Sequence, residues 1–211
     1  MRIIVLVVGE LQTNTYLVGC PSTGEALIID PGAEGGRILA AASRAGLRPT
    51  LICLTHGHAD HIGAVAEIRR TLNLPVLIHA EDAHMLTDPQ ANLSVWLGRG
   101  FVVGEPDRYL HDGEEVTCGK LKFQVLHVPG HTPGSICLYA PGVLFSGDTL
   151  FAGSVGRTDF PGGDWKKLLH SVRTKLLVLP DETVVYPGHG ASTTIGEEKE
   201  QNPFLTGEEM R

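Results

Sequence analysis

The sequence has little cysteine, few aromatic residues and no excess of basic charge. Its four cysteines, Cys20, Cys53, Cys118 and Cys137, are widely separated and form no Cys-x-x-Cys pair. This spacing argues against a disulfide framework and against a closed, cysteine-rich structural zinc site. Three of the cysteines lie in apolar or strand-like surroundings, so we expect buried free thiols in a reducing compartment.

Charge and hydropathy exclude two further classes of partner. Lys and Arg number 17 against 24 Asp and Glu, and no basic cluster offsets the net charge of −7. We therefore expect no nucleic-acid partner and no anionic membrane surface. The apolar run over residues 3–8 is too short for a signal peptide or a membrane span. A single domain over residues 1–211 and a cytoplasmic location are predicted, whereas the oligomeric state stays open.

Short apolar and β-branched runs alternate with turn residues along the chain, which predicts a series of strands. Residues 36–45 and the stretch that follows residue 60 carry apolar residues at helical spacing, and Asp164 can cap a third helix. Residues 88–107 lose this periodicity and form a lid, a substrate wall or a plain insertion. The predicted strands cover residues 3–8, 15–18, 26–29, 51–54, 75–78, 114–117, 121–126, 135–139, 143–145 and 183–186, and a polar tail follows.

Potential metal ligands gather between Thr55 and His61, in the order Thr-His-Gly-His-Ala-Asp-His. Imidazole nitrogen and carboxylate oxygen are ligands that zinc, manganese and non-haem iron accept. Four ligands crowd a single tetrahedral ion that must keep a position for water, so the cluster favours two ions. A histidine-rich polar loop without any metal is the alternative. The four candidates are His56, His58, Asp60 and His61.

The same context recurs three times downstream, as an apolar run, a tight Gly or Pro turn and then a potential ligand. His131, Asp148 and His189 each follow a predicted strand in this way. Ligands placed just past strands are expected to meet at one edge of the fold. Asp30 also ends a predicted strand, and it is either a plain turn residue or an acceptor that orients a ligand histidine.

The order His-x-His-x-Asp-His, then a distant His, an Asp and a last His, resembles the metallo-β-lactamase superfamily over essentially the whole chain. The resemblance implies an α/β fold, the αββα sandwich of two mixed β-sheets flanked by helices. True zinc β-lactamases usually depart from this pattern at the last residue of the first motif and at the bridging Asp, which argues against antibiotic hydrolysis. The family divides the ligands into a first metal set, a second set and a bridge: His56, His58 and His131; Asp60, His61 and His189; and Asp148. Asp60 and Asp148 are then also the candidate catalytic residues.

Within the superfamily the chain resembles short bacterial glyoxalase II, through Gly-Arg-Thr-Asp-Phe-Pro-Gly-Gly-Asp at 156–164 and Asn-Pro-Phe-Leu at 202–205. This resemblance implies a thioesterase that cleaves hydroxyacyl-glutathione or a related small thioester with a hydroxide bridging two divalent metals. Zinc is the first expectation, with iron or manganese as alternatives. Full-length members carry a helical C-terminal domain with glutathione contacts, and this chain ends at Arg211, so the thiol carrier stays open.

Thioester hydrolysis also suits the ligand set on chemical grounds. A thiol has a pKa near roughly 8.5, so it leaves as a thiolate with little help from an acid. No separate Ser or Cys nucleophile is then required. Arg157, amid glycines after Asp148, is a candidate for binding an anionic substrate tail. A solvated Arg157, or one paired with Asp159, is the alternative.

Other activities of the same fold compete with this interpretation. Persulfide dioxygenases also carry a Gly-Arg-Thr-Asp-Phe stretch and bind one iron through two His and an Asp, which His56, His131 and Asp148 match. A lactonase or another hydrolase would use the same two metals. The acidic balance disfavours a nuclease, and the scarcity of cysteine disfavours a purely structural metal protein.

The ligand count generates a first prediction, a metal content near two per chain. Three or four ligands serve one ion, whereas the sequence offers seven. Elemental analysis of protein purified without chelator measures this content. A value of one that added metal does not raise would contradict the binuclear assignment.

Overall fold

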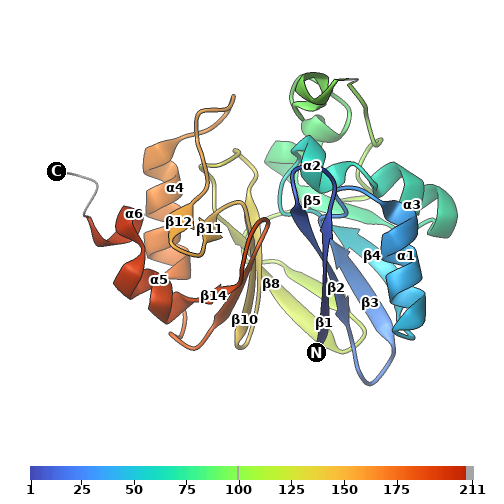
Figure 1. The fold of residues 1–211 in the computed structure, drawn as a ribbon, viewed down its shortest axis with the longest axis horizontal. Coiled ribbons are helices and arrows are strands. Elements are labelled where there is room, and N and C mark those ends of the chain that lie inside the picture. The colour runs from blue at the N-terminus through green and yellow to red at the C-terminus, as the bar shows by residue number, and fades with distance from the viewer. Residues whose placement is uncertain (99, 208–211) are drawn as a thin grey trace.

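The computed structural model describes residues 1–98 and 100–207. Two six-stranded β-sheets lie face to face in this structure, and helices cover the outer face of each sheet (Figure 1). The layers therefore follow the order helix, sheet, sheet, helix. The predicted αββα arrangement of two mixed sheets is confirmed.

The first sheet is formed by the N-terminal half of the chain. Its first three strands pair antiparallel and its last three join in parallel, so the sheet is mixed. In spatial order the strands are β1 (Arg2–Val8), β2 (Thr13–Gly19), β3 (Glu25–Ile29), β4 (Arg48–Cys53), β5 (Val76–His79) and β6 (Arg108–Leu110). The helical segments of this half are α1 (Gly35–Arg44), α2 (Ala59–Ile62), α3 (Val65–Leu72) and the short helices η1 (Ala80–Leu86) and η2 (Ser94–Leu97).

The second sheet is formed by the C-terminal half and contains one parallel pair among antiparallel ones. In spatial order its strands are β14 (Thr193–Thr194), β13 (Val184–Pro187), β10 (Val143–Gly147), β9 (Ile136–Ala140), β8 (Leu121–His127) and β7 (Glu115–Cys118). A small hairpin, β11 (Leu150–Phe151) and β12 (Ser154–Val155), stands beside it. The remaining helices are α4 (Trp165–Ser171), the π-helical η3 (Val172–Leu176), α5 (Ile195–Gln201) and α6 (Pro203–Thr206).

The central strand β3 explains why the predicted strands read as continuous apolar runs. Leu27 and Ile29 face the second sheet, whereas Ile28 faces the layer of α1 and α3. All three side chains are fully buried. A strand buried on both faces loses the alternation of apolar and polar residues that marks a half-exposed strand.

Two details of the predicted secondary structure are wrong. The helix after the histidine cluster was expected to be continuous, but it breaks into α2 and α3 because the Ala64 N–H donates to the Pro31 carbonyl at 2.9 Å. The expected polar tail contains β14, α5 and α6. Thr194 and Glu197 form a capping box at the start of α5, a signal present in the sequence as Thr-x-x-Glu.

Other predictions from composition agree with the structure. All four cysteines are buried and free. Asp164 caps α4 by accepting a hydrogen bond from the Lys167 N–H at 3.0 Å. Within residues 1–98 and 100–207, no helix combines the length and the apolar character needed to cross a membrane.

Candidate active site

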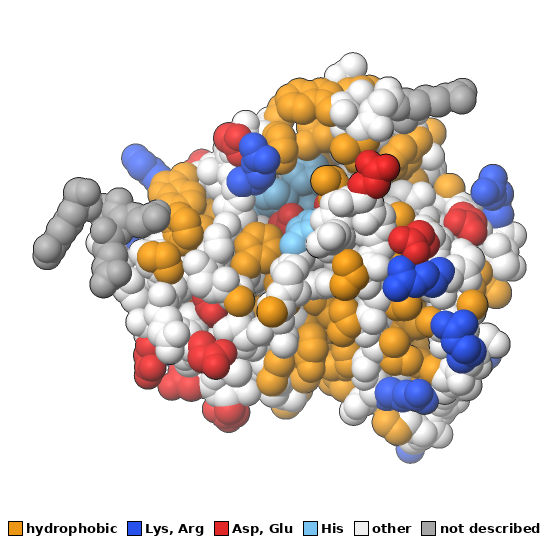
Figure 2. Space-filling view, in the orientation of Figure 1, with side chains coloured by type: hydrophobic (Ala, Val, Ile, Leu, Met, Phe, Trp, Pro, Cys, Tyr) orange, Lys and Arg blue, Asp and Glu red, His pale blue; other side chains and the backbone are white. Residues whose placement is uncertain are grey.

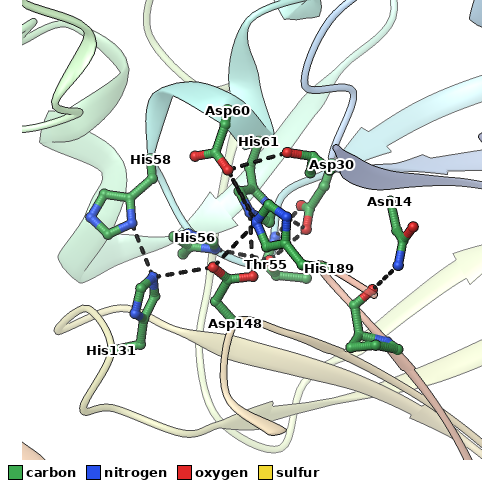
Figure 3. A network of polar contacts seen from close by, with 12 residues as sticks. Asn14, Asp30, Thr55, His56, His58, Asp60, His61, His131, Asp148 and His189 are labelled. Atoms are coloured by element: carbon green, nitrogen blue, oxygen red, sulfur yellow. Dashed lines mark hydrogen bonds and ion pairs between the residues drawn. The ribbon is translucent and has the colours of Figure 1, made fainter. Parts of the chain in front are cut away.

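The seven predicted ligands follow four strands of the two sheets and point toward one another (Figure 3). The loop after β4 carries His56 and His58 and leads into α2, which carries Asp60 and His61. The loops after β8, β10 and β13 carry His131, Asp148 and His189. Tertiary structure thus brings together residues that are up to 133 positions apart in the chain, as the numbers of His56 and His189 show.

Three histidines form the first group, His56, His58 and His131. Their potential ligand atoms all lie within 4.8 Å of one another. His58 Nδ1 and His131 Nε2 are 3.0 Å apart, and all three residues are buried. This spacing suits nitrogen ligands that converge on one ion.

The second group consists of Asp60, His61 and His189. His189 Nε2 lies 3.1 Å from Asp60 Oδ2, and the Nε2 atoms of His61 and His189 are 3.4 Å apart. Its potential ligand atoms also lie within 4.8 Å of one another. A mixed set of imidazole and carboxylate ligands is one that zinc, iron and manganese accept.

Asp148 lies between the two groups. Its Oδ2 is 3.7 Å from His131 Nε2 in the first group and 3.6 Å from His189 Nε2 in the second. Its Oδ1 is 3.4 Å from His61 Nε2. Gly188 permits this close approach, because a Cβ there would lie 2.2 Å from Asp148 Oδ1. The carboxylate therefore occupies the position that a bridging ligand requires.

Hydrogen bonds to the outer ring nitrogens orient four of the five imidazoles. His131 Nδ1 donates to the Arg157 carbonyl at 2.8 Å, and His189 Nδ1 donates to the Leu11 carbonyl at 3.1 Å. In the neutral rings this leaves the Nε2 lone pair facing the centre. Such anchoring of the non-ligating nitrogen is typical of metal-binding histidines.

His61 and His56 are anchored through Asp30. Asp30 Oδ2 accepts from His61 Nδ1 at 3.0 Å and from the Thr55 hydroxyl at 2.6 Å. The Thr55 oxygen is then the acceptor for His56 Nδ1 at 3.1 Å. Asp30 Oδ1 also accepts from the Thr55 backbone N–H at 2.7 Å. Of the two alternatives drawn from the sequence, these contacts favour the orienting acceptor over the plain turn residue.

Two buried atoms of the centre have no hydrogen-bond partner among the described residues, His56 Nε2 and Asp148 Oδ1. Buried polar atoms are almost always paired, so an orphaned nitrogen and an orphaned carboxylate oxygen in one cluster require another partner. A cation supplies that partner for both atoms. The residues present therefore fit a metal centre.

The electrostatics of the centre suit metal binding. Burial, and then the neighbouring His131, lower the pKa of His58 to about 3, so that its ring is neutral and one ring nitrogen keeps a free lone pair. Burial opposes ionisation of Asp148, but His61, His131 and His189 together outweigh it and lower the pKa of Asp148 to about 2. Burial also opposes the charge on His61, yet the carboxylates of Asp60 and Asp148 raise the pKa of His61. These carboxylates are ionised at neutral pH.

Sequence reasoning missed Asp82, a buried carboxylate on η1 that supports the ligand loops. Asp82 accepts from the Thr132 hydroxyl and the Gly134 N–H, both at 2.6 Å, next to His131. On the same short helix, Met85 packs against Gly57, where a Cβ would lie 2.6 Å from Met85 Cβ. The signal in the sequence is an Asp within a short helical segment. This pattern is too common to show that the Asp stabilises the ligand loops.

A cavity of about 500 Å³ opens over the two ligand groups. In Figure 2 hydrophobic side chains surround a hollow with histidine at its base. Part of its wall comes from the 88–107 loop, through Leu93, Trp96 and Leu97. Asn92 holds this loop in place, since its side chain donates to the carbonyls of Met85 and Phe101. The 88–107 loop therefore forms part of the cavity wall, and its role toward a substrate stays a prediction.

Arg157 also lines the cavity, but its guanidinium is already engaged. Its Nε and Nη2 donate to the Asp159 carboxylate at 2.7 and 2.6 Å. The guanidinium carbon lies 4.1 Å from the centroid of the Phe160 ring. The pairing with Asp159, given above as the alternative to substrate binding, is thus present, and a role of Arg157 in binding substrate stays a prediction.

Two groups of ligands joined by one carboxylate, at the base of a cavity, define the class of this protein: a metal-dependent enzyme with a binuclear metal site. The chain belongs to the metallo-β-lactamase superfamily, because the model of that family, described as "Metallo-beta-lactamase superfamily", matches residues 8–189.

Two relatives show the range of names within the family. The chain is 41% identical to "Probable metallo-hydrolase YqgX" of Bacillus subtilis (strain 168), over 95% of each chain. It is 38% identical to "Hydroxyacylglutathione hydrolase GloC" of Haemophilus influenzae (strain ATCC 51907 / DSM 11121 / KW20 / Rd), over 97% of this chain and 98% of that protein.

Solved structures place the chain in the same fold. The B3 metallo-beta-lactamase BLEG-1 matches with a TM-score of 0.93 and 44% identity, over 97% of this chain and 100% of that one. The structure of TTHA1623 in a di-iron-bound form matches with a TM-score of 0.86 and 44% identity, over 96% of this chain and 100% of that one. The structure of ETHE1 from Myxococcus xanthus matches with a TM-score of 0.83 and 36% identity, over 98% of this chain and 85% of that one. The structure is that of a metallo-hydrolase of this superfamily.

The contacts of Asp30 generate a second prediction. Asp30→Asn keeps the left-handed backbone at φ 49° that Asn tolerates, but it removes the charge that orients His61. We expect the affinity for metal to fall by about 10–100-fold, the usual cost of losing such a support. Competition with a coloured chelator measures this affinity. Asp164→Asn, which keeps a helix cap, is the control, and equal affinities in the two variants would contradict the assignment.

Proposed function

We propose that the protein is a glyoxalase II-type thioesterase that hydrolyses a small thioester at a centre of two divalent metals, most simply zinc. The observation that carries the proposal is the position of Asp148 between two three-residue ligand groups, with orphaned acceptor atoms in the centre. The relative named as a hydroxyacylglutathione hydrolase supports the thioester as substrate. The predicted cytoplasmic location and the absence of nucleic-acid or membrane partners stay predictions from composition.

The ligand residues have distinct roles in this proposal. His56, His58 and His131 would hold one cation, and Asp60, His61 and His189 the other, with Asp148 shared. Bound there, the cations supply the Lewis acidity that lowers the pKa of a shared water toward roughly 7 and offsets negative charge on the substrate carbonyl oxygen.

The chain's own residues set the conditions for this chemistry. Burial and the anchored Nδ1 atoms keep the imidazoles in fixed orientations, so little rearrangement is needed when substrate binds. The low pKa of Asp148 keeps its carboxylate free of protons at neutral pH. A thiolate leaves without a protein acid, which agrees with a cavity whose described lining offers no titratable donor outside the centre apart from Arg157.

Persulfide dioxygenation is the main alternative on this fold, and a two-metal lactonase is another. ETHE1 from Myxococcus xanthus is a structural neighbour, and His56, His131 and Asp148 match the three ligands expected for a single iron. The di-iron-bound form of TTHA1623 leaves the metal itself open. The distinguishing feature is the second ligand group, which a one-iron oxygenase does not use.

Asp60→Ala therefore separates hydrolase from dioxygenase. Asp60 belongs only to the second ligand group, so its loss removes one cation and its charge from a hydrolase. We expect the thioesterase rate to fall by at least roughly 10²-fold, as when a single oxyanion contact is removed. Steady-state thiol release measures the rate, and unchanged circular dichroism serves as the control for folding. Oxygen uptake on glutathione persulfide that survives in Asp60→Ala, with no thioester turnover in the parent, would establish the dioxygenase instead.

β-Lactam hydrolysis is a second candidate, because the structure of BLEG-1, a B3 metallo-beta-lactamase, is 44% identical over nearly the whole chain. The ligand pattern of the sequence argued against this activity. We expect the thioester to exceed nitrocefin in kcat/KM by at least tenfold, about 1.4 kcal/mol of transition-state stabilisation, in the same zinc-loaded preparation. Comparable kcat/KM values for the thioester and nitrocefin would show that the protein hydrolyses β-lactams as efficiently as thioesters.

A further inference from the structure

Outside the two ligand groups, the lining of the cavity over the metal centre is mostly hydrophobic, and we call six of these side chains the apolar wall. Its residues come from four separate segments: the β1–β2 turn, the 88–107 loop, β11 and the 156–164 loop. They are Leu11, Leu93, Trp96, Leu97, Phe151 and Phe160.

The apolar wall reaches both ligand groups. The Phe160 ring lies 5.7 Å from the His58 ring of the first group, and the Phe151 ring lies 6.4 Å from the His189 ring of the second. Trp96 extends the wall outward, with its ring 6.2 Å from that of Phe160. A molecule whose reactive carbonyl sits at the metals would therefore rest its remaining atoms on these side chains.

Three residues of the apolar wall are exposed to solvent in the free protein. Trp96 is 69% exposed, Leu97 56% and Leu11 51%. Apolar side chains gathered at the mouth of a cavity, rather than scattered singly, mark a binding surface. An apolar ligand that covers them removes this surface from water, and the gain in free energy grows with the area covered.

Charged ligands gain little from the same surface. Among the described residues that line the cavity outside the ligand groups, Arg157 is the one charged side chain, and its Nε and Nη2 already donate to Asp159. Glutathione carries carboxylates and an ammonium group. Placing them against apolar side chains without partners costs free energy, because they lose hydration and gain no compensating contact.

We propose that the thiol carrier of the substrate is an uncharged, apolar chain rather than a charged peptide such as glutathione, and that the apolar wall binds this chain. The inference rests on the thioesterase function proposed above. A hydroxyacyl group is only a few atoms long, so the carrier is the part that fills a cavity of about 500 Å³. Trp96 is then a residue that determines specificity.

The test compares two lactoyl thioesters that share one acyl group, one with glutathione and one with N-hexanoylcysteamine. Both carriers are primary alkyl thiols, so the leaving groups are alike, while the carriers differ in charge, hydrophobicity and size. We expect kcat/KM to be at least tenfold higher for the N-hexanoylcysteamine thioester. An equal or higher value for the glutathione thioester overturns the proposal.

Trp96→Ala connects this preference to the apolar wall. We expect about a tenfold loss of kcat/KM for the apolar thioester, chiefly through KM, and less than a threefold change for the glutathione thioester. Trp165→Ala is the matched control, because Trp165 is the only other tryptophan and packs on Phe204, away from the cavity. An equal loss for both thioesters in Trp96→Ala would show that the residue supports the fold rather than selects the carrier.

Two further variants test whether Arg157 or Arg99 contributes to activity on the charged glutathione thioester. Asp159→Asn releases the guanidinium of Arg157, and we expect kcat/KM for the glutathione thioester to rise while the apolar thioester is unaffected. Arg99 lies outside the described residues, so Arg99→Ala is measured in the same series. The preference is expected to persist in Arg99→Ala, and a glutathione activity that depends on Arg99 counts against the proposal.

Binding of unreactive analogues separates this inference from the function on which it rests. Isothermal titration calorimetry of the S-propyl thioethers of the two carriers measures affinity without turnover. Tighter binding of the apolar thioether, lost in Trp96→Ala, supports the apolar wall even if neither thioester is hydrolysed, an outcome that refutes the thioesterase alone. Equal affinity of the two thioethers refutes the carrier preference, whatever the activity.

Discussion

The Asp30 carboxylate is the contact on which the order of the metal centre depends. It holds the Thr55 backbone, the Thr55 hydroxyl and the His61 ring at once, and through Thr55 it also orients His56. A single buried carboxylate thus fixes one histidine from each ligand group. Because a buried charge of this kind is stable only when its acceptors are satisfied, the loop after β4 has little freedom to rearrange.

Three further ligands, His131, Asp148 and His189, follow strands of the second sheet. Backbone carbonyls at Arg157 and Leu11 hold His131 and His189, and Asp82 ties the His131 loop to η1. These two carbonyls lie on the β1–β2 turn and on the loop after β12, so the site draws on loops from both halves of the chain. The sandwich therefore functions as a rigid frame for a site built from loops.

The apolar wall uses the same frame for a different purpose. Leu11 follows β1, whereas Phe151 and Phe160 belong to the second half of the chain, and their neighbours at the metal centre are His189 and His58. Substrate selection and metal binding thus share loops. A change in the wall that leaves the anchored nitrogens in place can alter the substrate without altering the metals.

The sequence by itself indicated the ligand types, because the candidate ligands follow apolar runs and tight turns, and such patterns are local. The two-sheet fold was implied by the resemblance of the ligand order to the superfamily rather than by these local patterns. Sequence reasoning missed the break between α2 and α3, since the bond from Ala64 to Pro31 is not local. It also missed α5 and α6, although the Thr-x-x-Glu capping signal of α5 is present in the sequence. Only the tertiary structure decided that Asp30 orients His61, that Asp159 pairs with Arg157, and that Trp96 borders the cavity. The contact of Asp30 with His61 and the position of Trp96 depend on distances between segments remote in the chain, which spacing along the sequence does not encode. Arg157 and Asp159 are only two positions apart, and their pairing was left open by the sequence because it depends on the conformation of the folded loop.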